Sequence, residues 1–151
     1  EIASCLVGSE MCIRDRYREE EREMVPYCQA TGVGVIPWFA VAAGMLTRPW
    51  DDQSTERAKT DPYLAAIFKS GDGVAEKAIV DRVEEVAKKK NVAMAQVATA
   101  WLLSKPGVNP LLGLSKKERI DQAVAAIHVK LTEEEIKYLE EPYVPKPVMG
   151  Y

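Results

Sequence analysis

The stretch that decides the fold runs from Gly32 to Leu46 and reads Gly-Val-Gly-Val-Ile-Pro-Trp-Phe-Ala-Val-Ala-Ala-Gly-Met-Leu. Its first half is a short apolar run, rich in β-branched residues and bounded by glycines, which predicts a buried parallel strand from Val33 to Trp38. Helical patterns precede and follow this run, so strands alternate with helices, as in an α/β barrel or a doubly wound sheet. In both architectures the loop after a strand holds the ligand, so we expect function between Trp38 and Leu46.

The segment before this strand, from Tyr17 to Thr31, is expected to be mostly helical. Its acidic start suits the positive end of a helix dipole. Pro26 is tolerated only in the first turn of a helix, so we expect the regular helix to begin near Glu23. Gly32 follows as the expected C-cap.

The second half of the chain reads as helices around one more strand. Periodic apolar residues predict helices over 76–90, from 93 or 94 to 104, over 116–126 and over 133–141, with a short strand over 109–113. Ser115 is the expected N-cap of the helix 116–126, and Thr132 with Glu135 predicts a capping box at the last helix. The region from Arg48 to Gly73 is long and polar, and such connections are usually functional or mobile. The tail 142–151 is expected to be an extended strap.

The composition limits the function. The 151 residues carry a formal net charge of -3, which gives no support for nucleic-acid binding, and no apolar run approaches the ~20 residues of a membrane span. Three cysteines, Cys5, Cys12 and Cys28, form no metal-binding or disulfide pattern, so the cytoplasm is the expected compartment.

One cluster of polar residues suggests an anion site. Ser115 as an N-cap would direct backbone donors and the positive end of a helix dipole outward, and Lys116 and Arg119 lie three residues apart. Serine, lysine and arginine in this arrangement suit a phosphate. The alternative is a capped helix with a solvated basic face.

Several motifs that recur in the same order resemble the aldo-keto reductases over residues 17–151. They are Tyr17–Met24, Pro26–Cys28, Gly32–Trp38, Gly44–Leu46, Met94–Ala98, Ala100–Leu102, Gly113–Lys116 with Arg119, Leu131–Glu135 and Glu140–Tyr143. The resemblance implies the C-terminal part of a (β/α)8 TIM barrel, an α/β fold, here with two short parallel strands and several helices. A full barrel needs roughly 250 residues, so its N-terminal part would be absent.

The resemblance also implies an NADP(H)-dependent oxidoreductase that reduces aldehydes or ketones, which are small-molecule carbonyl substrates. The residue matching Trp38 stacks on the nicotinamide, although a core aromatic is the alternative. The residues matching Ser115, Lys116 and Arg119 bind the 2′-phosphate of NADP, and Gln122 falls where an acidic residue contacts adenine.

Gly44 and Leu46 belong to the matching loop on the phosphate side of the cofactor, where glycine permits a close approach of the backbone. The loop also departs from the family pattern. That pattern has serine and arginine where this chain has Phe39 and Ala43.

The family's catalytic Asp, Tyr, Lys and His have no match in this chain, so we expect no catalytic residue here and no activity from the chain alone. His128 is the only histidine, and we expect a partly buried structural residue. A second interpretation is a non-catalytic barrel that acts as a regulatory or binding subunit, like the potassium-channel β subunits. The oligomeric state stays open.

Residues 1–16 differ from the rest because they sustain neither a helical nor a strand period. Residues 5–16 resemble the conceptual translation of a transposase-type sequencing adapter. We therefore expect 1–16 to be a non-native or disordered arm without function, ahead of a barrel fragment over 17–151.

Overall fold

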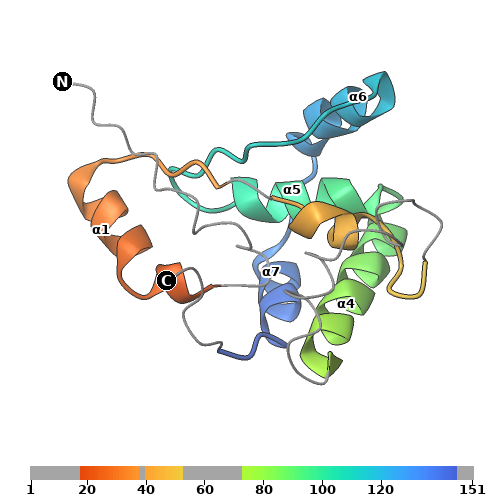
Figure 1. The fold of residues 1–151 in the computed structure, drawn as a ribbon, viewed down its shortest axis with the longest axis horizontal. Coiled ribbons are helices and arrows are strands. Elements are labelled where there is room, and N and C mark those ends of the chain that lie inside the picture. The colour runs from red at the N-terminus through yellow and green to blue at the C-terminus, as the bar shows by residue number, and fades with distance from the viewer. Residues whose placement is uncertain (1–17, 38–39, 53–72, 146–151) are drawn as a thin grey trace.

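The computed structural model describes residues 18–37, 40–52 and 73–145 (Figure 1). Predictions for residues 1–17, 38–39, 53–72 and 146–151, which include Trp38 and most of the long polar region, fall outside this range. The described elements are the 3₁₀ helices η2 (Glu19–Glu21) and η3 (Ala42–Thr47) and the α-helices α1 (Met24–Thr31), α4 (Val74–Lys90), α5 (Met94–Leu103), α6 (Lys117–Ala126) and α7 (Glu133–Glu140).

The helix before the strand is split in two at its acidic start. η2 is a single 3₁₀ turn, and α1 begins only at Met24, which places Pro26 in its first turn as predicted. Gly32 ends α1 at φ 72°, and the N–H of Val33 donates to the carbonyl of Cys28 over 2.8 Å. The predicted glycine C-cap is therefore confirmed, and Cys28 is buried.

Helices α4 and α5 form the centre of the molecule, with α7 packed against α4 (Figure 1). α4 buries the predicted apolar face of Ile79, Val83 and Val86, and it begins two residues earlier than the sequence suggested. α5 is buried nearly all round, as its sequence predicts, and Val97 and Leu102 have no exposed surface. This packing of apolar side chains is the main source of stability in the described part.

The start of α7 has the predicted capping box. The N–H of Glu135 donates to Oγ1 of Thr132 over 3.2 Å, and the N–H of Thr132 donates to Oε2 of Glu135 over 2.9 Å. Burial raises the pKa of Glu135, but the hydrogen bond from Lys90 and the N–H of Thr132 outweigh burial and hold that pKa below its usual value. The same carboxylate thus caps α7 and ties it to the end of α4 over 2.8 Å.

The two predicted strands are parallel but much shorter than expected. They meet in one isolated bridge between Val35 and Val108, so the pairing begins one residue before the predicted 109–113. The N–H of Val35 donates to Gly107, and the N–H groups of Asn109 and Leu111 donate to Val35 and Pro37, each over 2.8 Å. Proline at position 37 has no N–H to donate to the carbonyl of Asn109, so this one bond of the parallel pattern is missing although the Leu111 bond to Pro37 is made.

α6 lies at the edge of the described structure, away from α4 and α7 (Figure 1). Ala126 is its one buried residue, whereas Val124 is 56% exposed and Ile127 57%. The prediction of a partly buried His128 is wrong, because this residue is exposed just after the end of α6, next to the exposed Ile127.

Candidate functional site

The parallel pairing places two loops at the same edge of the fold. Because the segments around Val35 and Val108 run in the same direction, the chain after Pro37 and the chain after Leu111 leave from the same end of the pair. The first leads to η3 and the second to the start of α6. The two loops predicted to bind the cofactor therefore both follow the carboxyl end of the strand pair, which is the edge where α/β folds bind ligands.

Gly44 and Leu46 occupy different environments within η3. Gly44 has φ 94°, a conformation that glycine adopts at no steric cost. The side chain of Leu46 packs into the hydrophobic core and is only 1% exposed. Gly44 thus suits a close approach by a phosphate, while the role of Leu46 as a cofactor contact stays a prediction.

The prediction that Ser115 is an N-cap is wrong. α6 begins at Lys117, so Lys116 takes the N-cap position, and no side chain caps the helix. Ser115 lies one residue too early, and its Oγ instead accepts a hydrogen bond from Nη1 of Arg119 over 3.2 Å. The first N–H groups of α6 are consequently left without a side-chain acceptor, which favours an anion at this end.

The remaining predicted residues of this loop are on the surface. Lys116, Arg119 and Gln122 are all exposed, and the N–H of Arg119 donates to the carbonyl of Lys116 over 3.1 Å. The two cationic side chains therefore lie at the positive end of the helix dipole. An anion bound there would interact favourably with the side chains and with the dipole. The donor set therefore fits a phosphate, whereas Trp38, the expected nicotinamide contact, lies outside the described residues.

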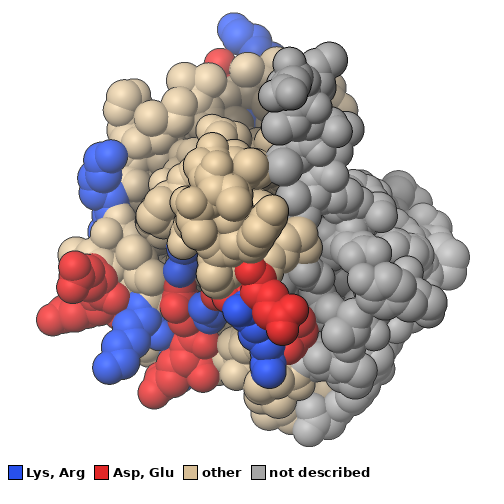
Figure 2. Space-filling view, turned by 90° about the vertical axis from the view of Figure 1, so that its left-hand side faces the viewer, with Lys and Arg blue, Asp and Glu red and all other residues tan. Residues whose placement is uncertain are grey.

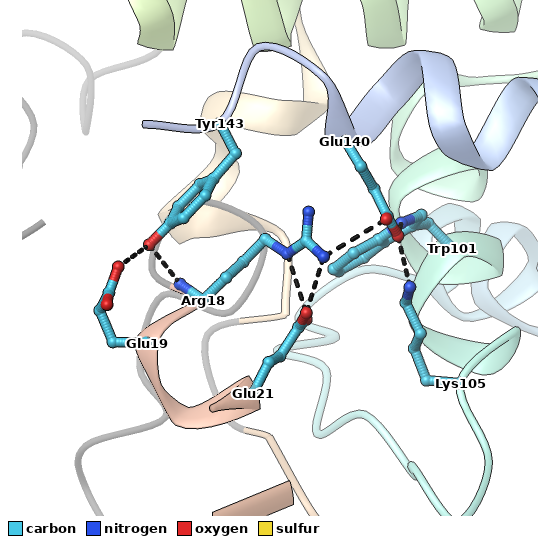
Figure 3. Close-up of polar contacts among 7 residues, drawn as sticks. All are labelled: Arg18, Glu19, Glu21, Trp101, Lys105, Glu140 and Tyr143. Atoms are coloured by element: carbon cyan, nitrogen blue, oxygen red, sulfur yellow. Dashed lines mark hydrogen bonds and ion pairs between the residues drawn. The ribbon is translucent and has the colours of Figure 1, made fainter. Parts of the chain in front are cut away.

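A second cluster, which the sequence analysis did not single out, surrounds Trp101 (Figure 3). The Arg18 guanidinium lies 5.7 Å from the Trp101 ring centre and pairs with Glu21 over 2.7 Å and with Glu140 over 3.3 Å. Glu140 also accepts from Nε1 of Trp101 and from Lys105. This Arg18 cluster borders a small pocket of about 30 Å³. Among the residues that line the pocket, Leu46 is the one that the sequence analysis predicted as a cofactor contact. A pocket of that size holds one or two water molecules, so it is too small for a dinucleotide.

The Arg18 cluster joins the start of the described chain to its end. The hydroxyl of Tyr143 donates to Oε1 of Glu19 over 2.7 Å and accepts from the N–H of Arg18 over 2.9 Å (Figure 3). Burial, followed by the hydrogen bond to Glu19, raises the pKa of Tyr143 above its usual value. The charged side chains of the cluster form ion pairs and hydrogen bonds with one another, so we assign the cluster a structural role.

Three observations on the described residues concern charge, membrane spans and metal ions. Acidic and basic side chains are interleaved in one band on the face shown in Figure 2, so no field of a single sign covers that face. Among the described residues, no helix has the length and hydropathy needed to cross a membrane. In the same part of the chain, no group of three or more His, Cys, Asp or Glu side chains could hold a metal ion.

Comparison with known proteins gives one consistent result. The family model described as "Aldo/keto reductase family" matches residues 3–143. The versiconal hemiacetal acetate reductase of Aspergillus parasiticus is 56% identical over 131 residues, which cover 87% of this chain and 38% of that protein. A putative aryl-alcohol dehydrogenase of Schizosaccharomyces pombe is 58% identical over 135 residues, or 89% of this chain and 37% of the relative.

Solved structures agree in fold. A thermostable aldo-keto reductase, Tm1743, in complex with the inhibitor epalrestat has a TM-score of 0.61 at 23% identity, covering 85% of this chain and 36% of the other. An aldo/keto reductase from Klebsiella pneumoniae in complex with NADP and acetate has a TM-score of 0.59 at 22% identity, covering 87% and 38%. The described helices and strand pair thus correspond to part of a TIM barrel, as predicted.

Proposed function

The chain belongs to the aldo/keto reductase family, and from that premise we propose that it carries part of the NADP(H) site of a reductase of aldehydes or ketones. The names of the similar proteins, a hemiacetal acetate reductase and an aryl-alcohol dehydrogenase, support carbonyl and alcohol chemistry. The Klebsiella pneumoniae relatives bind NADP and NADPH. The chain spans less than two fifths of the two curated relatives named above, so the activity of a whole protein is itself part of the proposal.

The start of α6 is the observation that carries this proposal. Lys116 and Arg119 are exposed there beside backbone donors that no side chain caps. A 2′-phosphate bound at this place would meet a lysine, a guanidinium and the positive end of a helix dipole. Only NADP(H) carries that phosphate, so the same residues would select it over NAD(H).

Each of the other predicted residues would contact a different part of the cofactor. Gly44 would let the backbone of η3 approach the pyrophosphate, Gln122 would contact the adenine, and Trp38 would stack on the nicotinamide. When bound, NADPH supplies the hydride for reduction of the carbonyl carbon. The chain offers no residue matching the family's acid–base group, so we propose that this chain alone binds the cofactor without turnover.

Substituting Arg119→Ala tests the proposal. We expect NADPH affinity to fall roughly 10- to 150-fold, since a charge-assisted hydrogen bond contributes about 1.5–3 kcal/mol and 1.36 kcal/mol is tenfold. NADH affinity should stay the same, because NADH lacks the 2′-phosphate. Fluorescence titration of both cofactors at fixed low salt measures the two dissociation constants.

The matched control is Arg22→Ala, which removes another exposed arginine, one that pairs with Glu19 over 2.8 Å far from α6 in the chain. Its affinity for both cofactors should equal that of the wild type. Equal weakening for NADH and NADPH in Arg119→Ala would assign that residue to the fold. Unchanged affinity for both cofactors would instead support the alternative interpretation, in which these residues form a solvated basic face.

A further inference from the structure

The loop 40–48 holds its backbone in an unusual conformation. Three successive residues have positive φ: Ala42 at 48°, Ala43 at 53° and Gly44 at 94°. Alanine seldom adopts such angles, because its Cβ approaches the carbonyl oxygen, so the two alanines carry strain that the rest of the loop must hold. Two contacts do so: the N–H of Gly44 donates to Val41 over 2.9 Å, and Oγ1 of Thr47 donates to the carbonyl of Gly44 over 2.7 Å.

The side chain of Arg48, the last residue of this loop, lies next to Gly44. A β-carbon built on Gly44 would be 3.5 Å from Nη1 of Arg48, so the guanidinium sits next to the one residue there that has no side chain. The residue is half-buried. Partial burial strengthens the interaction of its charge with any anion that reaches the loop.

Arg48 shares with Arg119 the lack of a carboxylate partner among the described residues, and in this it differs from the other three described arginines. Arg18, Arg22 and Arg82 each pair with a glutamate, at distances from 2.6 to 3.3 Å. Within residues 18–37, 40–52 and 73–145, the ion pairs formed by arginine include none to Arg48. Among the described residues no carboxylate therefore competes with an anion for the guanidinium donors of Arg48.

The same loop lacks a basic residue that the family pattern contains. The family pattern has an arginine where this chain has Ala43, so no cation directly precedes Gly44 in the sequence. We propose that Arg48 supplies that cation and binds the pyrophosphate of the dinucleotide from the adjacent side of Gly44. A guanidinium forms paired N–H···O bonds with phosphate oxygens, and the glycine lets the backbone come close at the same point. This inference rests on the proposed function, because it names a further residue of the same cofactor site.

The test separates the pyrophosphate from the 2′-phosphate with three ligands. NADPH carries both groups, NADH carries the pyrophosphate alone, and 2′-AMP carries the 2′-phosphate alone. In Arg48→Ala we expect affinity for NADPH and NADH to fall equally, by roughly tenfold to a hundredfold, with 2′-AMP unchanged. In Arg119→Ala the pattern reverses: NADPH and 2′-AMP weaken while NADH does not. Titrations use the full 151-residue chain.

Two further variants control for structure. Arg48→Lys keeps the charge and loses the planar fork, so it should retain part of the affinity for both dinucleotides. The double variant Ala43→Arg with Arg48→Ala moves the cation back to the position that the family uses, and it should recover the binding of both dinucleotides. Recovery would show that Arg48→Ala weakened binding through the lost charge and left the fold intact.

Each other outcome overturns the inference in a distinguishable way. If the wild-type chain binds both dinucleotides and Arg48→Ala binds them equally well, Arg48 has no role while the proposed function stands. If Arg48→Ala weakens NADPH and 2′-AMP but not NADH, Arg48 belongs with the 2′-phosphate. If the wild-type chain binds none of the three ligands, the inference and the proposed function fail together.

Discussion

Two regions of the molecule differ in how completely they are packed. The helical body of α4, α5 and α7 buries its apolar side chains, and Val80, Val97 and Leu102 have no exposed surface. In the region of the strand pair and α6, by contrast, Leu111 is 61% exposed and Val124 56%. In the helical body the apolar side chains bury one another, whereas the strand pair is covered on one face.

The alternation along the strands shows which face is covered. Val35 is 2% exposed and Val108 5%, while Ile36 is 45% exposed. Parallel strands in α/β folds are normally buried on both faces, so the exposure of Ile36 and Leu111 is unusual for such a pair. The chain spans 38% of its Aspergillus parasiticus relative. The candidate cofactor residues Ser115, Lys116, Arg119 and Gln122 lie in the less completely packed region, whereas Leu46 packs into the hydrophobic core.

The strongest test of the comparison uses two neighbouring leucines of α5. Leu102 has no exposed surface and Leu103 is 39% exposed. Leu102→Ala should destabilise the chain by about 2–5 kcal/mol, because it leaves a cavity in the packed body. Leu103→Ala should change the free energy of unfolding by less than about 1 kcal/mol. Urea denaturation followed by circular dichroism measures both, and equal losses would contradict a body packed around α5.

The Arg18 cluster can be broken through Glu140 and read out by pH. Burial raises the pKa of Glu140, but the hydrogen bond from Lys105 and the charge of Arg18 outweigh burial and hold that pKa below its usual 4.5. The ionised form is therefore favoured in the folded state, so its stabilisation is present above pH ~4.5 and is lost as the pH falls through the folded pKa. Glu140→Gln should cost about 1.5–3 kcal/mol at neutral pH, and the difference from the wild type should shrink in acid.

The matched control for Glu140 is its neighbour Glu141, whose side chain is 67% exposed and pairs with Arg82 over 2.6 Å. An exposed ion pair contributes at most about 1 kcal/mol, so Glu141→Gln should have a small effect at neutral pH. Thermal unfolding across the acid range compares the two variants. A difference between wild type and Glu140→Gln that stays constant from neutral to acid pH would show that the charge of Glu140 does not stabilise the fold.

The smallest effect on stability, and the one that sharpens the comparison, is expected on α6. We expect the wild-type chain to self-associate and to be poorly soluble, because its strand pair and the apolar face of α6 are uncovered. Val124→Lys should change the free energy of unfolding by less than about 0.5 kcal/mol but reduce self-association. Val144→Lys is the control, since Val144 is also 56% exposed but lies on the tail after α7. Analytical ultracentrifugation measures the outcome, and a monomeric wild-type chain would refute the expectation.

Features that depend on a few consecutive residues follow from the sequence alone. The glycine C-cap at Gly32, the capping box of Thr132 and Glu135, and the buried all-apolar helix α5 are present as predicted. Each depends on local backbone geometry or on the helical period, which the order of the residues determines directly. The family and its barrel fold followed in the same way, from motifs that recur in order along the chain.

Features that depend on which segments meet were decided only by the tertiary structure. The two strands pair only in the single bridge between Val35 and Val108, and His128 is exposed although Ala126, two residues earlier, is buried. Ser115 binds Arg119 because α6 starts one residue later than its sequence suggested. Arg48 had no local signal at all: its position beside Gly44 arises from the turn of the loop, and a one-dimensional pattern does not report where a flexible side chain comes to rest.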